Sequence, residues 1–153
     1  MLFYSIYNCT VGAGKTTLLK LVSGQELPTT GVAFINKYNI VTHRSLAQRS
    51  MGLCPQFDTL IERLTVKENL ILFGRIKGIS GMQIREVCES FMLIMDIKKY
   101  ENKLVQQLSG GNRRKVSLVV ALLGAPPTMY LDEVQDIMLI LICHKNGNFL
   151  YLY

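Results

Sequence analysis

The chain has 153 residues, carries a net charge of +6, and contains 49% hydrophobic and 18% charged residues. This length supports one hydrophobic core, and the hydrophobic content excludes a disordered chain. The longest uninterrupted apolar run, Ile137 to Cys143, is too short to cross a bilayer, and the N-terminus lacks the basic start of a signal peptide. The cysteines have neither metal-site spacing nor disulfide-rich density, so we expect reduced thiols in a cytosolic setting at Cys9, Cys54, Cys88 and Cys143.

The net positive charge allows a nucleic-acid-binding interpretation. The densest basic clusters are Arg113 to Lys115 and Lys98-Lys99. No aromatic residues alternate with these clusters, whereas a base-stacking surface needs them. We therefore favour solvated helix faces and charge directed at a triphosphate over nucleic-acid binding.

The start of the chain predicts a strand, a glycine-rich turn and a helix. Leu2 to Tyr7 is apolar, Gly12 to Thr17 reads Gly-Ala-Gly-Lys-Thr-Thr, and a short helix is expected from Thr16 to Val22. Backbone N–H groups of such a turn form an anion nest, Lys15 can reach the β- and γ-phosphates, and the Thr16 hydroxyl can ligate Mg²⁺. We therefore predict a nucleoside triphosphate site; the simpler alternative is a tight turn before a helix.

A short strand and a longer helix are expected next. Gly31 to Ile35 reads as a strand, with a turn near Asn36 and Lys37. Thr65 to Glu68 has the pattern of a capping box, in which the first and fourth side chains satisfy each other's backbone N–H groups. A helix should begin there and end at Gly78.

A second helix should follow closely. Ser80 to Gln83 also has the capping-box pattern and predicts an amphipathic helix to about Met95. Met92 and Met95 are expected in the helix core rather than in a special site. Both predicted helices lie between Gln56 and Ser109 in the sequence.

A second phosphate-directed feature is Leu108 to Gly111, ahead of the helix-like run Asn112 to Leu123. A helix start offers unpaired N–H groups and the positive end of the helix dipole to an anion. Ser109 can cap that start, and two glycines let a phosphate approach the backbone. Since the segment has no lysine of its own, it should contact a phosphate that another element holds; alternatively, Ser109 is only a helix cap.

A third feature is Met129 to Glu133, a short apolar run that ends in two carboxylates. In a parallel sheet, such a strand would deliver Asp132 to a metal and Glu133 to a water beside the γ-phosphate. The alternative is an ordinary polar strand end.

Together these motifs resemble the nucleotide-binding domain of ATP-binding cassette (ABC) transporters, from about Ile6 to Glu133. Gly12 to Thr17 matches the Walker A motif, Leu108 to Gly111 the family signature, and Asp132-Glu133 Walker B with its catalytic glutamate. Cys54-Pro55-Gln56-Phe57-Asp58 is similar to the Q-loop, although Gln56 is an ordinary loop residue when taken alone. The residues in and around these motifs are most similar to those of subfamily A, whose members mostly move lipids.

The resemblance implies an α/β fold: a P-loop nucleotidase core with a small antiparallel sheet and an inserted helical subdomain at about residues 58–115, incomplete at both ends. It implies ATP and Mg²⁺ as ligands, with Glu133 as the catalytic residue. Mg²⁺ would be held by Thr16, Gln56 and Asp132. The residues implied in nucleotide binding are Gly12, Ala13, Gly14, Lys15, Thr16, Thr17, Gln56, Ser109, Gly110, Gly111 and Asn112.

The resemblance also implies partners. Two cassettes would associate head to tail, so that the signature of one chain contacts ATP held by the P-loop of the other. Membrane-spanning domains outside this chain would hold the cassette on the cytoplasmic side of a membrane. Two alternatives remain: a module that binds nucleotide or a second cassette without hydrolysis, and an unrelated P-loop enzyme such as a small kinase, which the signature argues against.

The sequence departs from the family pattern near both ends. Cys9 stands where the first glycine of the loop belongs, and no adenine-stacking aromatic residue can be assigned. After Glu133 the resemblance stops at Val134, so residues 134–153 form a divergent tail of unknown role. His144 follows Glu133 too closely to be the family's switch histidine. We expect that truncation or an altered reading frame replaced the distal strands, which would leave an exposed sheet edge.

Overall fold

The computed structural model describes residues 5–7, 14–54, 60–132 and 148–152. The chain divides into two compact units. We call residues 1–56 together with 125–153 the sheet unit, and residues 57–124 the helical unit. Each unit contains its own layer of buried apolar side chains, and each is described by itself below.

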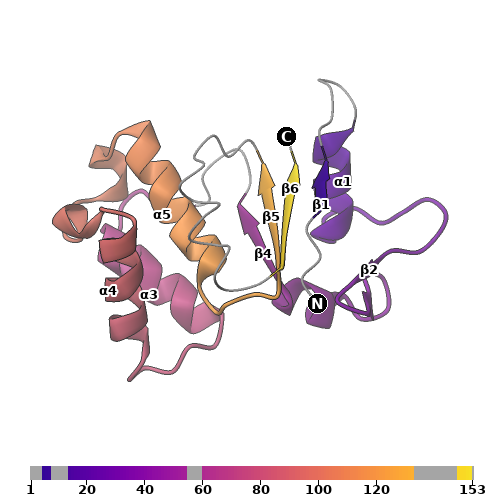
Figure 1. Ribbon diagram of the computed structural model, residues 1–153, viewed down its shortest axis with the longest axis horizontal. Coiled ribbons are helices and arrows are strands. Elements are labelled where there is room, and N and C mark those ends of the chain that lie inside the picture. Colours follow the sequence, from indigo (N-terminus) through magenta and orange to yellow (C-terminus); the bar gives the residue numbers. More distant parts are fainter. Residues whose placement is uncertain (1–4, 8–13, 55–59, 133–147, 153) are drawn as a thin grey trace. The chain divides into compact units, whose positions relative to one another are not determined.

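The sheet unit is built around four parallel strands (Figure 1). Their spatial order is β1-β6-β5-β4, so the last strand of the chain lies between the first and the strand that precedes it. No element was predicted over residues 148–152, yet these residues pair on both sides. The strands are β1 (Ser5–Tyr7), β4 (Met51–Cys54), β5 (Thr128–Asp132) and β6 (Asn148–Leu152).

A helix and a short antiparallel ribbon complete the sheet unit. Helix α1 (Lys15–Val22) begins one residue earlier than predicted. The predicted strand over Gly31 to Ile35 is shorter than expected, since only Phe34–Ile35 (β2) pairs, with Tyr38–Asn39 (β3). The predicted turn is confirmed: Asn36 and Lys37 both have positive φ, as a two-residue hairpin turn requires. Helix α2 (Arg44–Arg49) then leads into β4.

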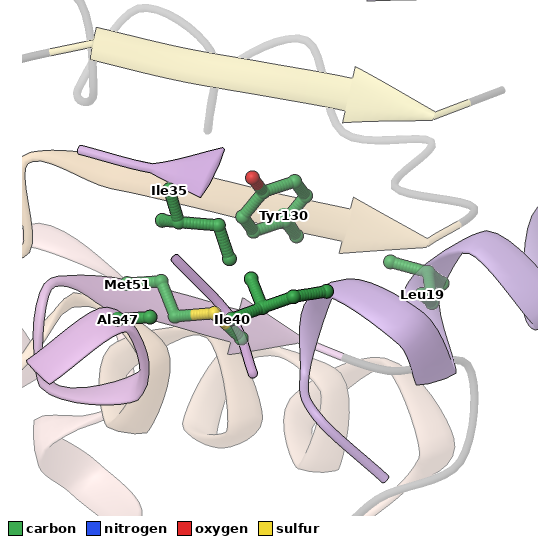
Figure 2. Close-up of a cluster of buried hydrophobic side chains, with 6 residues drawn as sticks. All are labelled: Leu19, Ile35, Ile40, Ala47, Met51 and Tyr130. Carbon is green, nitrogen blue, oxygen red and sulfur yellow. The ribbon is translucent and has the colours of Figure 1, made fainter. Parts of the chain in front are cut away.

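Six buried side chains join these elements into one core (Figure 2). They come from α1, β2, the residue after β3, α2, β4 and β5, and each is at most 9% exposed. Burial of such apolar surface supplies about 25 cal/mol per Å². The core therefore fixes the ribbon and α1 against the sheet; its members are Leu19, Ile35, Ile40, Ala47, Met51 and Tyr130.

The turn residue Asn36 adds a polar link inside the sheet unit. Its side-chain Nδ2 donates to the carbonyl of Ser50 at 2.8 Å, and its Oδ1 accepts from the Thr128 hydroxyl at 2.9 Å. Thr128 begins β5, and Ser50 immediately precedes β4. One turn side chain thus ties the ribbon to two neighbouring strands of the sheet.

The helical unit contains three α-helices and two short 3₁₀ turns in its described part. These are α3 (Val66–Ile76), α4 (Ile84–Ile94), η1 (Lys98–Tyr100), η2 (Val105–Gln107) and α5 (Gly110–Leu122). Among the described residues, no helix has the length and apolarity needed to cross a membrane. The largest fully buried side chains of the helical unit are Val66, Leu70, Ile84, Met92, Ile97, Val105, Leu118 and Leu123.

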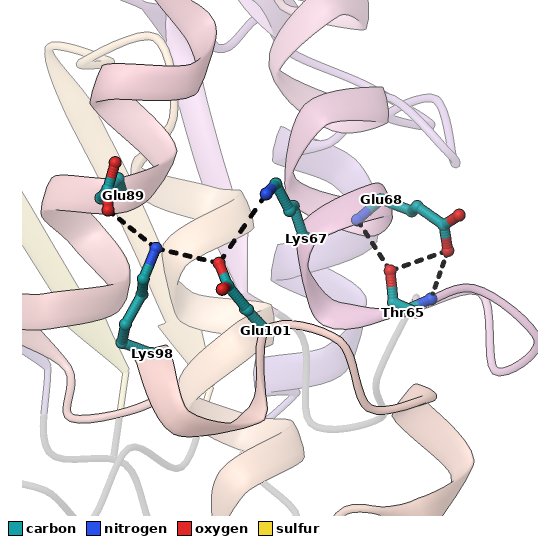
Figure 3. Close-up of polar contacts among 6 residues, drawn as sticks. All are labelled: Thr65, Lys67, Glu68, Glu89, Lys98 and Glu101. Atoms are coloured by element: carbon teal, nitrogen blue, oxygen red, sulfur yellow. Dashed lines mark hydrogen bonds and ion pairs between the residues drawn. The ribbon is translucent and has the colours of Figure 1, made fainter.

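The first predicted capping box is confirmed (Figure 3). The Thr65 hydroxyl accepts from the Glu68 backbone N–H at 3.2 Å, and the Glu68 carboxylate accepts from the Thr65 backbone N–H at 2.8 Å. Helix α3 starts at the next residue, and Gly78 follows its end with φ of +85°. These hydrogen bonds hold the pKa of Glu68 below its usual value, because a backbone donor and the Thr65 hydroxyl both favour the charged carboxylate.

The second predicted capping box is wrong. The Ser80 hydroxyl donates to the Gln83 side chain at 3.1 Å, and the Ile84 backbone N–H donates to the Ser80 carbonyl at 2.9 Å. Residues 81–83 therefore form a turn, and helix α4 begins at Ile84 with no side-chain cap. Its packing was predicted correctly, since Met92 and Met95 are both buried.

Ion pairs connect α3, α4 and η1 in the helical unit (Figure 3). The Lys98 ammonium lies 2.8 Å from a Glu89 oxygen and 2.9 Å from a Glu101 oxygen, and Lys67 lies 3.9 Å from the same Glu101 oxygen. The hydrogen bond from Lys98 lowers the pKa of Glu101. These side chains are part-exposed, so each pair contributes roughly 0–1 kcal/mol.

Candidate nucleotide-binding site

The start of α1 has the geometry of an anion site. Gly14 precedes the helix with φ of +84°, a left-handed conformation that favours glycine. Its carbonyl accepts the first helical hydrogen bond, from the Leu18 N–H at 2.9 Å. The first turn carries no acidic residue, so the N–H groups and dipole of this eight-residue helix are not opposed by a local carboxylate.

The carboxyl ends of two strands, β1 and β5, lie at the same level of the sheet, and β1 precedes this helix start in the sequence. We call this end of the parallel strands the sheet edge. Tyr7, the last residue of β1, is the register partner of Leu152 in β6. Asp132, the last residue of β5, is the partner of the same Leu152 on its other side. Because neighbouring strands lie about 4.8 Å apart, the Tyr7 and Asp132 backbones are roughly 10 Å apart.

Strand β4 ends at the same edge. Cys54 pairs with Leu131, one residue before Asp132, and the predicted Gln56 follows two residues later in the chain. All these strands are parallel, so their carboxyl ends lie on one side of the sheet. That side is where open α/β sheets bind ligands.

Several predicted site residues lie outside the described part of the chain. These are Gly12, Ala13, Gln56 and Glu133. The backbone of Lys15 and Thr16 lies in the first turn of α1, and the backbone of Asp132 lies at the end of β5. Thr17 is exposed on the same helix. The structure thus places the end of β1, which precedes the predicted Walker A segment in the sequence, and Asp132 at the end of β5 on one side of the sheet.

The predicted signature begins a helix in the helical unit. Ser109 is the N-cap of α5, and its hydroxyl accepts from the Asn112 backbone N–H at 3.4 Å. Gly110 and Gly111 are exposed, and a Cβ added at either would meet nothing within 4 Å. The helix start is therefore open to a ligand, and α5 carries no acidic residue in its first turn.

Basic residues follow this helix start. Arg113, Arg114 and Lys115 are half-buried. The Arg113 guanidinium donates to Glu62 at 3.1 Å, so this charge contributes to the packing of the helical unit. The prediction that this basic cluster serves a solvated or triphosphate-facing helix face remains a prediction.

At the C-terminal end of α5, backbone carbonyls accept hydrogen bonds from Lys77, the residue that follows α3. The Lys77 ammonium donates to the carbonyls of Val120 and Ala121, at 2.7 and 2.9 Å. The last carbonyls of a helix have no intrahelical partner, so Lys77 satisfies two of them. Burial lowers the pKa of Lys77 to about 8.

Two asparagines make side-chain hydrogen bonds that were not predicted from the sequence. Asn69 is completely buried in α3, and Asn36 forms the ribbon turn with two side-chain hydrogen bonds. A sequence signal exists for Asn69, since it occupies an apolar helix position between Val66 and Leu70. A polar residue at such a position needs hydrogen-bond partners from elsewhere in the chain.

Comparison with known proteins identifies the class that this fold and site define. A family model described as ABC transporter matches residues 10–135, which is most of the chain. The chain therefore belongs to the ABC transporter family, as predicted. Its relatives place it in subfamily A.

Two curated relatives illustrate this placement. ABC transporter A family member 5 of Dictyostelium discoideum is 46% identical over 125 residues, which cover 82% of this chain and 8% of that protein. Phospholipid-transporting ATPase ABCA3 of Mus musculus is 40% identical over 122 residues, covering 80% of this chain and 7% of that protein. The chain thus matches less than a tenth of the length of these relatives.

Solved structures confirm the predicted P-loop α/β fold. The ATP-binding subunit of an ABC transporter superimposes with a TM-score of 0.83 at 23% identity, covering 98% of this chain and 67% of that one. A dimeric ATP-binding cassette in a post-hydrolysis state, bound to ADP and Pi, superimposes with a TM-score of 0.80 at 23% identity. It covers 99% of this chain and 74% of that one.

Proposed function

We propose that the chain binds and hydrolyses ATP as the cassette of a subfamily A transporter that moves lipids. The observation that carries this proposal is the shared register partner Leu152, which sets the end of β1 and Asp132 at one level of the sheet edge. The end of β1, which leads into the phosphate loop in the sequence, and the backbone of Asp132 at the end of β5 are then close enough to serve one triphosphate.

The residues predicted to hold a metal fit a magnesium ion in their chemistry. Thr16 supplies a hydroxyl, Asp132 a carboxylate and Gln56 an amide oxygen, and oxygen ligands are those that Mg²⁺ prefers. When bound, Mg²⁺ neutralises charge on the β- and γ-phosphate oxygens. These three residues would hold the ion.

The remaining roles belong to the chain's own groups. Backbone N–H groups of Gly12 to Thr17 would bind the phosphates, and Lys15 would reach the β- and γ-phosphates. Glu133 would orient the attacking water and accept its proton. The start of α5 would contact the triphosphate held by a second cassette through Ser109 and Gly111, with Gly110 and Asn112 beside them.

The partners and location follow from the family. We propose a head-to-tail dimer of cassettes, joined to membrane-spanning domains on the cytoplasmic side of a membrane. The dimeric state of one superimposed cassette and the phospholipid-transporting name of one relative support this. The family match ends at residue 135. For this reason we retain a second candidate function, in which the chain binds nucleotide or forms a dimer without hydrolysing ATP.

Binding and turnover of ATP by the purified chain separate these candidates. Lys15→Ala should abolish ATP binding, whereas Lys20→Ala, the same change in the last turn of α1, should leave binding within about twofold, since Lys20 is exposed and pairs with Glu26. Glu133→Gln should bind ATP but lose turnover. Binding without turnover in the parent chain would select the second candidate, and turnover unaffected by Glu133→Gln would contradict the role of Glu133.

A mixing experiment tests the head-to-tail arrangement. Ser109→Asp keeps a good N-cap but places a negative charge where a phosphate should bind, so turnover should fall while helix content is unchanged. A mixture of Ser109→Asp and Lys15→Ala chains contains dimers with one intact composite site, so it should regain part of the turnover that each variant lacks. No recovery in the mixture would contradict composite sites.

A further inference from the structure

The helical unit contains one completely buried asparagine with an unusually full set of partners. Asn69 lies in α3 with 0% exposure. Its Oδ1 accepts from the Ile61 N–H at 2.9 Å, and its Nδ2 donates to the carbonyls of Ile61, Leu64 and Thr65 at 3.0, 3.4 and 3.1 Å. A single side chain thus fixes the backbone of residues 61–65 from inside the unit. We call residues 61–65 the clamp loop.

The clamp loop pairs in turn with the segment that precedes the signature. The Val105 N–H donates to the Leu64 carbonyl at 3.0 Å, and the Gln106 N–H donates to the Glu62 carbonyl at 3.2 Å. Thr65 and Leu104 form an antiparallel bridge. Backbone hydrogen bonds therefore hold residues 104–106 in register with the loop that Asn69 fixes.

Residues 104–106 lead directly into the signature. Val105–Gln107 forms η2, and the Leu108 N–H donates to the Val105 carbonyl at 3.1 Å, one residue before the N-cap Ser109. The clamp loop also reaches α5 itself, because Glu62 accepts from Arg113 in the first turns of that helix. Two routes thus connect the clamp loop to the start of α5, one through backbone and one through side chains.

We propose that Asn69 is a positioning residue for the signature: its buried amide fixes the clamp loop, and the clamp loop fixes the position of Ser109 to Gly111. The side-chain hydrogen bonds of Asn69 go to residues 61–65, so it acts on the signature through residues 61–65 and 104–106. The effect on catalysis rests on the proposed function, whereas the positional coupling does not.

The nearly isosteric Asn69→Leu removes all four hydrogen bonds and takes the acceptor away from the Ile61 N–H, while the carbonyls of Ile61, Leu64 and Thr65 keep only their backbone donors. Amide hydrogen exchange of the full chain without nucleotide should then accelerate roughly tenfold or more in residues 61–65 and in 104–112 together. Met92→Ala is the matched control, because Met92 is also buried in this unit but lies in α4, away from the clamp loop. Its exchange should rise without concentrating in these two segments.

Two exchange results would overturn the proposal. One is faster exchange confined to residues 61–65, with 104–112 unchanged. The other is a uniform increase over the whole helical unit, as for Met92→Ala, which would make Asn69 an ordinary core residue. If Asn69→Leu does not fold, Asn69→Ser, which keeps a hydroxyl toward the Thr65 carbonyl, provides the same comparison with a smaller perturbation.

The comparison of ATP turnover with ATP binding distinguishes a positioning role from a purely structural one, which would not change kcat relative to the Kd for ATP. Asn69→Leu should lower kcat at least tenfold while the Kd for ATP at the chain's own P-loop stays within about twofold, because the signature acts on ATP held by the other cassette. Met92→Ala should leave the ratio of these two constants unchanged. An equal loss of ATP binding would contradict the proposal. A parent chain without turnover would defeat the proposed function, and the exchange experiment would still decide the role of Asn69.

Discussion

The helical unit and the sheet unit are each stabilised internally by a different kind of contact. In the helical unit, side chains and backbone groups close in sequence satisfy each other, as at the Thr65–Glu68 cap and the Asn69 loop contacts. In the sheet unit, parallel strands from distant parts of the chain pair, and the ribbon is tied to the sheet through Asn36. Local contacts can form within one unit alone, whereas the sheet edge that bears the proposed site needs strands from both ends of the chain.

The largest expected effect tests whether the units are separable. Leu70 is completely buried in α3, so Leu70→Ala should destabilise the helical unit by about 2–5 kcal/mol through lost burial and a cavity. Hydrogen exchange should accelerate across α3, α4 and α5 while β4 and β5 keep their protection. Leu93→Ala, the same change at a 62% exposed position, is the control and should change little. Equal acceleration in both units would show that they unfold together.

The polar link of the sheet unit should come next. Asn36→Ala removes hydrogen bonds to Ser50 and Thr128 and places alanine at φ of +47°, so we expect a loss of roughly 1–3 kcal/mol. Amide hydrogen exchange in β4 (Met51–Cys54) and β5 (Thr128–Asp132) measures this loss of stability. Asn36→Gly relieves the backbone strain but not the lost bonds; if it restores full protection, the hydrogen bonds contribute nothing.

The local cap of the helical unit should have a smaller effect. Thr65→Ala removes the side-chain acceptor for the Glu68 N–H and should cost about 1 kcal/mol in denaturant unfolding of the helical unit. Thr65→Ser keeps the hydroxyl and serves as the control. A loss as large as that of Leu70→Ala would mean that Thr65 also supports the bridge to Leu104, and would weaken the view that caps act locally.

The smallest effect should be a pH dependence of the helical unit. The pKa of Glu68 is lowered in the folded state by the Thr65 backbone and hydroxyl groups, so its stabilisation is present above the unfolded pKa and is lost as the pH falls through the folded pKa. Glu68→Gln keeps an acceptor for the cap but cannot titrate. The free energy of unfolding of Glu68→Gln should therefore fall less steeply in acid than that of the parent chain. Parallel curves of unfolding free energy against pH for the two chains would contradict this.

The same difference between the units explains what the sequence could predict. The Thr65 cap, the Gly78 stop and the Ser109 cap are set by residues within one or two turns of each other, and all three are confirmed. The Ser80 cap failed because the same spacing also allows a side-chain bond to Gln83, which the local pattern cannot distinguish.

Features that depend on distant partners could not be predicted. Strand β6 has the apolar, aromatic composition typical of a strand, but its place in the sheet is defined by backbone pairing with β1 and β5. The positioning role proposed for Asn69 depends on the pairing of the clamp loop with residues 104–106, which lie far along the chain. Motifs in the sequence were sufficient for the family. The alignment of the ends of β1 and β5 on either side of Leu152 could be seen only from the sheet order.

The position of β6 also has a consequence for protein synthesis. Among the described strands, β1 pairs with β6 alone, and β6 is the last of them to leave the ribosome. The helical unit is complete in the nascent chain well before that moment and can fold while translation continues. Strand β1 therefore has no described partner until residues 148–152 have been synthesised, and until then its backbone N–H and C=O groups lack the β6 groups with which they pair.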